Sequence, residues 1–104
     1  MIFLKYIILF IIIINNYGFT SSFKNEFRAT WVITWEYLNS SQTAAETMNR
    51  IDQIMDNHVA ANMNAVFFQV RQSGTAYYAS SYEPWGYYTG YEYPGFDPLH
   101  YAVN

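Results

Sequence analysis

The sequence predicts an α/β protein built on a β-α-β unit. Three segments indicate it: a β-branched and aromatic stretch at 27–35, an amphipathic stretch at 43–62, and a second apolar stretch at 65–71. Strand, helix and strand in this order are typical of two parallel strands joined by a crossover helix. The composition agrees, because 52% hydrophobic and only 12% charged residues are too apolar for a disordered chain.

The first strand is expected at 27–35, where neither Gly nor Pro interrupts the β-forming residues. The helix is expected to begin at Thr43, which forms a capping box with Glu46. Apolar side chains then recur at helical spacing and predict one buried stripe. That stripe consists of Ala44, Met48, Ile51, Met55 and Val59. Asn62 is expected to end the helix in the left-handed conformation.

The second strand is expected at 65–71, because a continuous apolar run is typical of a parallel strand buried on both faces. Residues 72–94 show no periodicity and predict a long, structureless loop, which is usually functional. A second helix is expected after it, with Asp97 as N-cap and Pro98 in the first helical position.

The N-terminal residues 1–22 are typical of a signal peptide. Lys5 supplies the positive charge, the apolar run at 6–14 is shorter than the ~20 residues of a membrane span, and small residues follow it. We therefore expect an exported protein, in the periplasm, on the cell surface or secreted, with no stable membrane span after cleavage. An uncleaved N-terminal anchor is the alternative.

Several classes of function are excluded or disfavoured by composition. The absence of cysteine excludes cysteine-ligated metals and a cysteine nucleophile. A net charge of −3, with no Lys or Arg between residues 72 and 104, disfavours a nucleic-acid partner. His58 is expected to be a partly buried structural histidine, and His100 has no partner histidine at metal-ligand spacing, so no metal is expected. No other cofactor is expected either.

One β-α-β unit and the start of a second helix cannot cover both faces of a two-stranded parallel sheet. We therefore expect residues 23–104 to be the N-terminal piece of a larger α/β protein.

Six short motifs follow one another along the chain: 26-EFRATWV-32, 64-NAVFFQVR-71, 76-AYYAS-80, 83-EPW-85, 89-TG-90 and 95-GFDPL-99. Together and in this order they resemble the glycosyl-hydrolase-like family 10 domain, a family of exported bacterial (β/α)8 barrels. The sequence departs from the family at Gln72, where Pro is usual, at Thr75, where Asp is usual, and at Asn62, where Gly is usual. The resemblance implies that residues 23–104 are the N-terminal fragment of a TIM barrel, incomplete at the C-terminus.

The resemblance implies a fragment of an exported glycoside hydrolase that acts on a polysaccharide, with cell-wall glycan as the substrate class. Such a fragment would be inactive alone, because it needs the missing C-terminal barrel strands. Two alternatives stay open. The first alternative to the hydrolase fragment is a non-catalytic carbohydrate-binding or surface-interaction module that uses the Tyr/Trp-rich loop. The second is a truncated reading frame without function.

Chemistry in a (β/α)8 barrel lies at the carboxyl ends of the strands and in the loops that follow. Gln69 and Arg71 are expected to end the second strand on one face, where they would bind substrate; a core amide and an ion pair are the respective alternatives. Tyr78 and Trp85 are the rings expected to stack on sugar, and packing against the rim of the barrel is the alternative.

Glycoside hydrolysis uses two carboxyl groups, and the catalytic pair is expected beyond residue 104. Glu36, just past the first strand, and Glu83, before Pro84, are the catalytic candidates within this chain. The alternative for each is a solvated or loop-bracing carboxylate.

Overall fold

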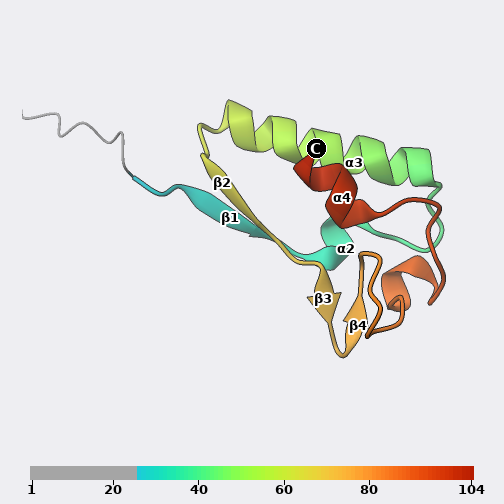
Figure 1. Cartoon of the computed structure of the whole chain (residues 1–104). Helices are drawn as coiled ribbons and strands as arrows, with labels where there is room; N and C mark the ends of the chain where they lie inside the picture. Colours follow the sequence, from blue (N-terminus) through green and yellow to red (C-terminus); the bar gives the residue numbers. More distant parts are fainter. Residues whose placement is uncertain (1–25) are drawn as a thin grey trace, which may run out of the picture.

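The computed structural model describes residues 26–104, so the predicted signal peptide lies outside the described residues. The elements are β1 (Ala29–Val32), α2 (Thr34–Tyr37), α3 (Ala44–Ala60), β2 (Ala65–Phe68), β3 (Arg71–Gln72), β4 (Thr75–Ala76), the 3-10 helix η2 (Tyr87–Thr89) and α4 (Pro98–Val103). Helices and strands are mixed, which confirms the α/β class (Figure 1). None of the described helices has both the length and the apolar character of a membrane span.

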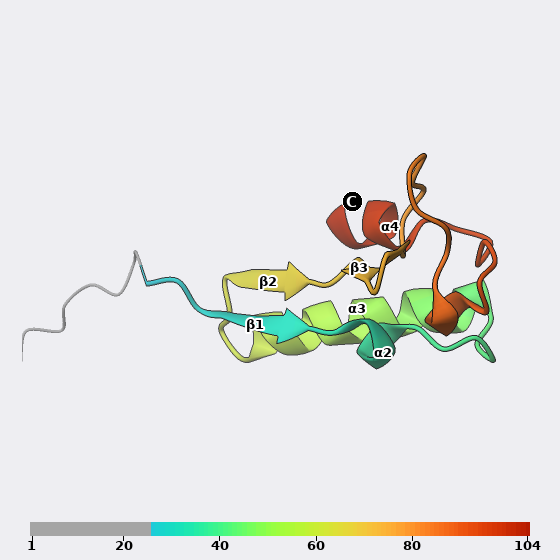
Figure 2. The same cartoon turned by 90° about the horizontal axis from the view of Figure 1, so that it is seen from below.

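The predicted β-α-β unit is present. β1 and β2 pair in parallel, with Ala29 opposite Ala65 and Val32 opposite Phe68. Helix α3 connects them and runs alongside the strand pair in both views (Figures 1 and 2). The carboxyl ends of the two strands point toward α2 and toward the β3–β4 hairpin (Figure 1). The hairpin therefore lies where a parallel sheet usually presents functional side chains.

The first strand is shorter than the predicted 27–35, and Thr34 and Trp35 belong to α2 instead. Two side chains stabilise this turn into helix. The Glu36 carboxylate accepts a hydrogen bond from the backbone N–H of Ile33 at 2.8 Å, and Gln69 Oε1 accepts from the Thr34 N–H at 3.2 Å. Thr34 and Gln69 are 35 residues apart in sequence, so no local sequence pattern predicts their contact.

Helix α3 begins as predicted: Thr43 and Glu46 form the capping box. The Glu46 carboxylate accepts from the Thr43 N–H at 2.7 Å, and these hydrogen bonds with Thr43 lower the pKa of Glu46. Asn62 follows the helix at φ 58°, which confirms the left-handed end.

Four of the five predicted members of the α3 stripe are confirmed, because Ile51 is buried and Ala44, Met48 and Met55 pack half-buried against the core. The prediction for Val59 was wrong: it is 76% exposed, whereas Thr47 and Ile54, which were not predicted, are buried. The stripe that faces the strands runs through 47, 51 and 54 and reaches the half-buried His58, so its neighbour Val59 turns to solvent. His58 is held there by the Thr30 hydroxyl on β1 and by the Ile54 carbonyl.

The core lies between the strand pair, α3 and the segment that follows β2. Its buried apolar side chains are Val32, Tyr37, Leu38, Ile51, Ile54, Tyr77 and Phe96. Tyr37 stacks on Phe68 with ring centroids 4.3 Å apart, and its hydroxyl donates to the Gln69 carbonyl at 2.6 Å. Burial of this phenol is the main reason that the pKa of Tyr37 is raised.

Residues 72–94 are not the structureless loop predicted from their lack of periodicity. β3 and β4 form an antiparallel hairpin, closed by Ser73 and Gly74, both at positive φ. Positive φ at both central residues is the type I′ arrangement that suits two-residue hairpins. Ala76 also forms a parallel bridge with Trp85, so a third chain segment joins the hairpin. Strands of two residues are too short to produce a visible alternation, which explains the wrong prediction.

The second helix begins as predicted. Asp97 is the N-cap of α4, its carboxylate accepts from the His100 N–H at 3.0 Å, and Pro98 occupies the first turn. The same carboxylate accepts from the Ala79 N–H at 2.9 Å. Tyr101 donates from its hydroxyl to Asp52 of α3 at 2.9 Å, which fixes α4 on that helix and raises the pKa of Tyr101.

Candidate functional site

The β3–β4 hairpin presents two different faces. Arg71 lies opposite Ala76, and Ala76 lies opposite Trp85, so these positions share one face. Tyr78 and Glu83, two residues from Ala76 and Trp85 respectively, belong to the same side. We call the side chains of Arg71, Tyr78, Glu83 and Trp85 the ionic face.

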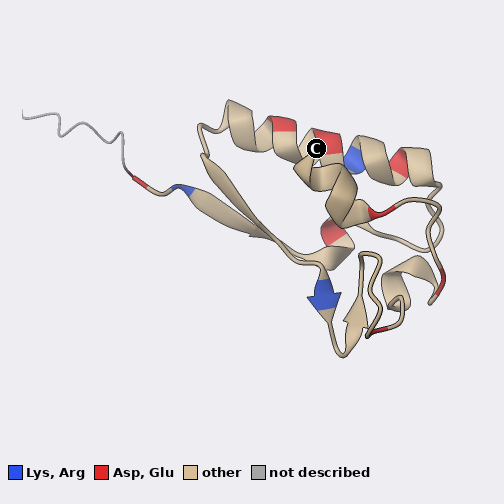
Figure 3. Ribbon diagram, viewed as in Figure 1, with Lys and Arg blue, Asp and Glu red and all other residues tan. Residues whose placement is uncertain are grey.

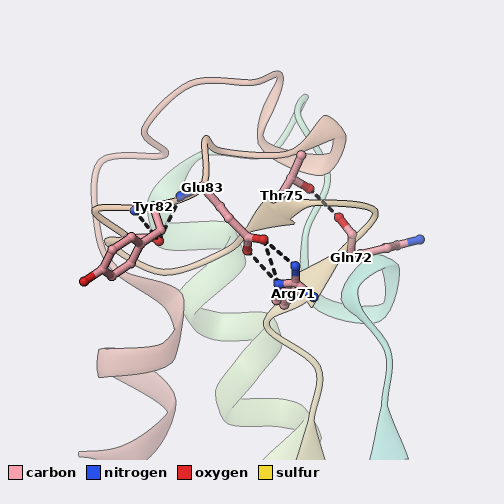
Figure 4. Close-up of polar contacts among 6 residues, drawn as sticks. Arg71, Gln72, Thr75, Tyr82 and Glu83 are labelled. Carbon is pink, nitrogen blue, oxygen red and sulfur yellow. Dashed lines mark hydrogen bonds and ion pairs between the residues drawn. The ribbon is translucent and has the colours of Figure 1, made fainter.

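Gln72 lies opposite Thr75 on the other face. There the structure forms a pocket of about 360 Å³. We call it the tyrosine pocket, after the residues that dominate its lining: Gln72, Thr75, Tyr77, Tyr87, Tyr88 and Tyr91. Figure 4 shows the Arg71 side chain directed at Glu83 and the Gln72 side chain extending away from that pair.

Arg71 and Glu83 form a bidentate ion pair. Arg71 Nε donates to both Glu83 oxygens, at 2.8 and 2.7 Å, and a terminal guanidinium nitrogen donates to Oε1 (Figure 4). The Arg71 side chain is 63% exposed and that of Glu83 is 19% exposed. The hydrogen bond from Arg71 lowers the pKa of Glu83, and the same contact raises the pKa of Arg71. Tyr78 lies close enough to contribute to the raised pKa of Arg71.

The turn before Glu83 fixes its direction. Ser80 Oγ accepts hydrogen bonds from the backbone N–H groups of Tyr82 and Glu83, both at 3.1 Å. Trp85, two residues later, is half-buried and lies 5.7 Å from the Tyr93 ring, measured between centroids. The structure thus brings three predicted substrate-binding residues, Arg71, Tyr78 and Trp85, to one face with the catalytic candidate Glu83.

Gln69 is the predicted site residue that lies elsewhere. β2 ends at Phe68, so Gln69 and Arg71 do not end one strand together as expected. The Gln69 side-chain oxygen accepts from both the N–H and the hydroxyl of Thr34, each at 3.2 Å. Thr34 is fully buried, and its polar groups depend on this oxygen.

Glu36, the other catalytic candidate, caps α2 through its carboxylate. Its carbonyl oxygen also accepts from Arg50 Nε of α3 at 2.8 Å. Within residues 26–104, no three His, Asp or Glu side chains come together as metal ligands would.

Charge is sparse around the hairpin. Figure 3 shows the basic colour on β3, the strand that contains Arg71, and the acidic colour scattered over α3 and the loops. Residues 72–104 contain no Lys or Arg, so Arg71 is the cation of this region. The ionic face therefore offers one fixed guanidinium beside aromatic rings, an arrangement that can bind hydroxyl-rich or anionic groups.

The tyrosine pocket was not predicted from the sequence. Gln72 Oε1 is buried without a hydrogen-bond partner, and it is the one such side-chain atom within the described residues. The signal that would have found the pocket is the Ser73–Gly74 pair, which marks a two-residue turn. Alternation on each side of that turn places Gln72, Thr75 and Tyr77 together.

Comparison with known proteins finds a partial similarity to a glycosyl hydrolase. No protein-family model matches it. A curated protein of Bacillus subtilis (strain 168), "Glycosyl hydrolase YngK", is 31% identical over 87 residues. The match covers 76% of this chain but 17% of the length of the Bacillus protein. The chain is thus similar to a short part of a glycosyl hydrolase, and this similarity supports a glycosyl-hydrolase-like relationship.

Proposed function

We propose that this chain is the N-terminal part of an exported glycoside hydrolase that acts on a polysaccharide, with cell-wall glycan as the substrate class. The observation that carries the proposal is the similarity to a Bacillus glycosyl hydrolase, since it spans most of this chain. The finer assignment, to the glycosyl-hydrolase-like family 10 barrel, rests on the motifs quoted above. The tyrosine-rich region after β2, placed at the carboxyl ends of the parallel strands, is consistent with it.

The exposed sheet face supports a role as part of a barrel. Trp31 is 63% exposed and Phe67 is 50% exposed, and their rings stack 5.9 Å apart on β1 and β2. Exposed rings of this size on a parallel sheet are normally covered, because parallel strands are buried on both faces. Further strands of a (β/α)8 barrel would cover them. Without those strands, residues 23–104 are expected to have no activity.

The ionic face gives the candidate residues different roles. Arg71, Tyr78 and Trp85 would hold the sugar chain through a guanidinium and two rings. Glu83 would not be the catalytic acid, because its lowered pKa keeps the carboxyl ionised, whereas a general acid needs a raised pKa. The acid would therefore come from another part of the protein.

A non-catalytic carbohydrate-binding module is the second candidate function. The many tyrosines and the absence of Lys and Arg in 72–104 favour it equally well. Hydrolysis of the polymer separates the two, since a binding module retains the glycan without cleaving it. The truncated reading frame, the third alternative, is tested by the DNA downstream of the codon for Asn104. A stop codon there would support it, and a continuation into a helix and a third strand would support the enzyme.

The deciding experiment measures polysaccharide turnover and binding by the full-length protein and two variants, Trp85→Ala and Arg71→Ala. We expect turnover or affinity to fall in both, while the melting temperature changes little. Tyr82→Ala is the matched control, because Tyr82 lies in the same loop and is 97% exposed. Parent-level turnover and binding in both variants would make the assignment of the ionic face wrong.

Export is tested independently of activity. N-terminal sequencing of the protein recovered from the periplasm, the cell surface or the medium should give a mature chain that begins close to residue 23. A protein recovered with Met1 or Ile2 at its terminus would contradict cleavage and favour the uncleaved anchor.

A further inference from the structure

We infer that the tyrosine pocket is a binding subsite for a single neutral sugar unit, separate from the ionic face on the opposite side of the hairpin. The inference rests on the proposed carbohydrate function and adds a second contact point to it. It also assigns a role to Gln72, which the sequence analysis did not place in any site.

The polar groups of the pocket favour a ligand that donates hydrogen bonds. Gln72 Oε1 is buried and unpartnered, which is costly for an amide oxygen unless another molecule supplies the donor. Thr75 lies opposite Gln72 on the hairpin, and its hydroxyl already donates to the backbone carbonyl of Gln72 at 2.7 Å. The Thr75 oxygen therefore has only its acceptor capacity left. Gln72 and Thr75 both line the pocket, and acceptors from two lining residues match the hydroxyl groups of a sugar.

The aromatic walls of the pocket favour a ligand that also has apolar faces. Tyr87 meets Tyr88 edge to face, with centroids 5.3 Å apart, and meets Tyr91 at 6.2 Å. Such rings stack on the C–H faces of sugars while their hydroxyls reach the polar edge. None of the residues that line the pocket is charged, so a neutral ligand fits better than a cation or an anion. The volume lies near the lower limit of ~300 Å³ for ligand sites, which favours one sugar unit.

Tyr91 provides a separate argument, because its backbone is strained. It adopts φ 64°, a left-handed conformation that is unfavourable for a bulky side chain, and it is 65% exposed. Exposure means that packing of this ring compensates little of the conformational cost. The strained backbone places the ring at the pocket, and strain of this kind is concentrated at functional sites.

The test measures affinity of the full-length protein for two neutral probes, cellotetraose and tetra-N-acetylchitotetraose, by calorimetry or ligand-observed NMR. Gln72→Met keeps the length of the side chain but removes the acceptor. We expect about fivefold weaker binding of the better probe, the size of one lost hydrogen bond. Tyr91→Gly removes the ring and relieves the strained backbone, so we expect a similar loss of affinity together with an unchanged or higher melting temperature.

Tyr82→Gly is the matched control, an exposed tyrosine of the same loop outside the pocket, and it should bind within about twofold of the parent, because a residue that makes no ligand contact changes affinity little. The cationic chitosan tetramer should bind more weakly than its acetylated form. Binding of neither neutral probe, or parent-level affinity in both Gln72→Met and Tyr91→Gly, would overturn the inference.

The two proposals fail in different ways. If the protein cleaves the polysaccharide but both pocket variants bind the tetrasaccharides normally, the hydrolase proposal stands and the subsite is wrong. If the tetrasaccharide binds in a Gln72-dependent manner but no polymer is cleaved, the subsite stands and the hydrolase proposal is wrong.

Discussion

The two faces of the β3–β4 hairpin differ in whether their polar side chains have hydrogen-bond partners. On the ionic face, the charge of Arg71 is matched by both oxygens of Glu83. On the pocket face, one residue along the chain, Gln72 leaves a buried oxygen without a partner. Both faces belong to strands of two residues each, so backbone geometry alone does not account for the difference.

This contrast indicates what each face can do for a ligand. A ligand at the ionic face would compete with a formed ion pair for the guanidinium, so much of its gain would replace an existing interaction. A ligand in the tyrosine pocket would donate a hydrogen bond to the Gln72 oxygen, which has no existing hydrogen bond to give up. We therefore expect the ionic face to orient a ligand, and the pocket to contribute more affinity per hydrogen bond.

The largest effect is expected for Gly86→Ala, which damages the pocket face alone. A Cβ at Gly86 would overlap the Tyr77 hydroxyl and Thr75 Oγ1, and Tyr77 is only 1% exposed. Overpacking of this kind typically costs about 1–3 kcal/mol of unfolding free energy. Denaturant unfolding of the full-length protein measures it.

Gly74→Ala is the control for that substitution, because no atom lies within 4 Å of its Cβ position, while its φ of 73° is unfavourable for Ala. It should cost about 1 kcal/mol from conformation alone. If Gly86→Ala is as stable as the parent, the close approach of Gly86 to Tyr77 is not a constraint on the pocket.

A smaller effect is expected for Ser80→Ala, which loosens the ionic face alone. Two backbone N–H groups, of Tyr82 and Glu83, would lose their acceptor. The expected loss is about 1 kcal/mol, measured by thermal unfolding. The exposed neighbour Ser81 provides the control, Ser81→Ala. Equal stability of the two variants would show that Ser80 does not hold Glu83 in place.

The smallest effect is expected from the Arg71–Glu83 pair itself, because exposed ion pairs stabilise proteins little. The pKa of Glu83 is lower in the folded state than in the unfolded state. The contribution of the ion pair to the free energy of unfolding is therefore complete above the unfolded-state pKa of Glu83. It is lost as the pH falls through the lower pKa of the folded state. Glu83→Gln should lower the melting temperature slightly at neutral pH and not at all in strong acid. A pH-independent difference between parent and variant would show that the effect is not electrostatic.

The parts of the fold that follow from local signals could be predicted. The capping box at Thr43, the helix end at Asn62 and the Asp97–Pro98 helix start each depend on residues within one turn. The parallel pairing of β1 and β2 followed from their order around a helix. Helix α2 could not be predicted, because its start depends on a contact between Thr34 and Gln69, far apart in sequence.

The candidate site was predictable in its residue types but not in its pairings. Arg71 and Glu83 were both singled out, yet they lie twelve positions apart, across a hairpin that was not predicted. Gln69 and Gln72 show the limit clearly. The two residues have the same chemistry and lie three positions apart, but Gln69 satisfies the buried Thr34 while Gln72 opens into a pocket. The departures from the resembled family at Gln72 and Thr75 both lie at that pocket.

Asp97 connects two parts of the chain whose motions would otherwise be independent. One carboxylate oxygen accepts from the His100 N–H in the first turn of α4, and the other accepts from the Ala79 N–H next to the ionic face. Fraying of that helical turn must therefore release Ala79 as well. In hydrogen exchange, the Ala79 and His100 amides should behave as one cooperative unit that opens and closes together. The local stability of the loop that carries the candidate site thus depends on a helix whose N-cap lies eighteen residues after Ala79.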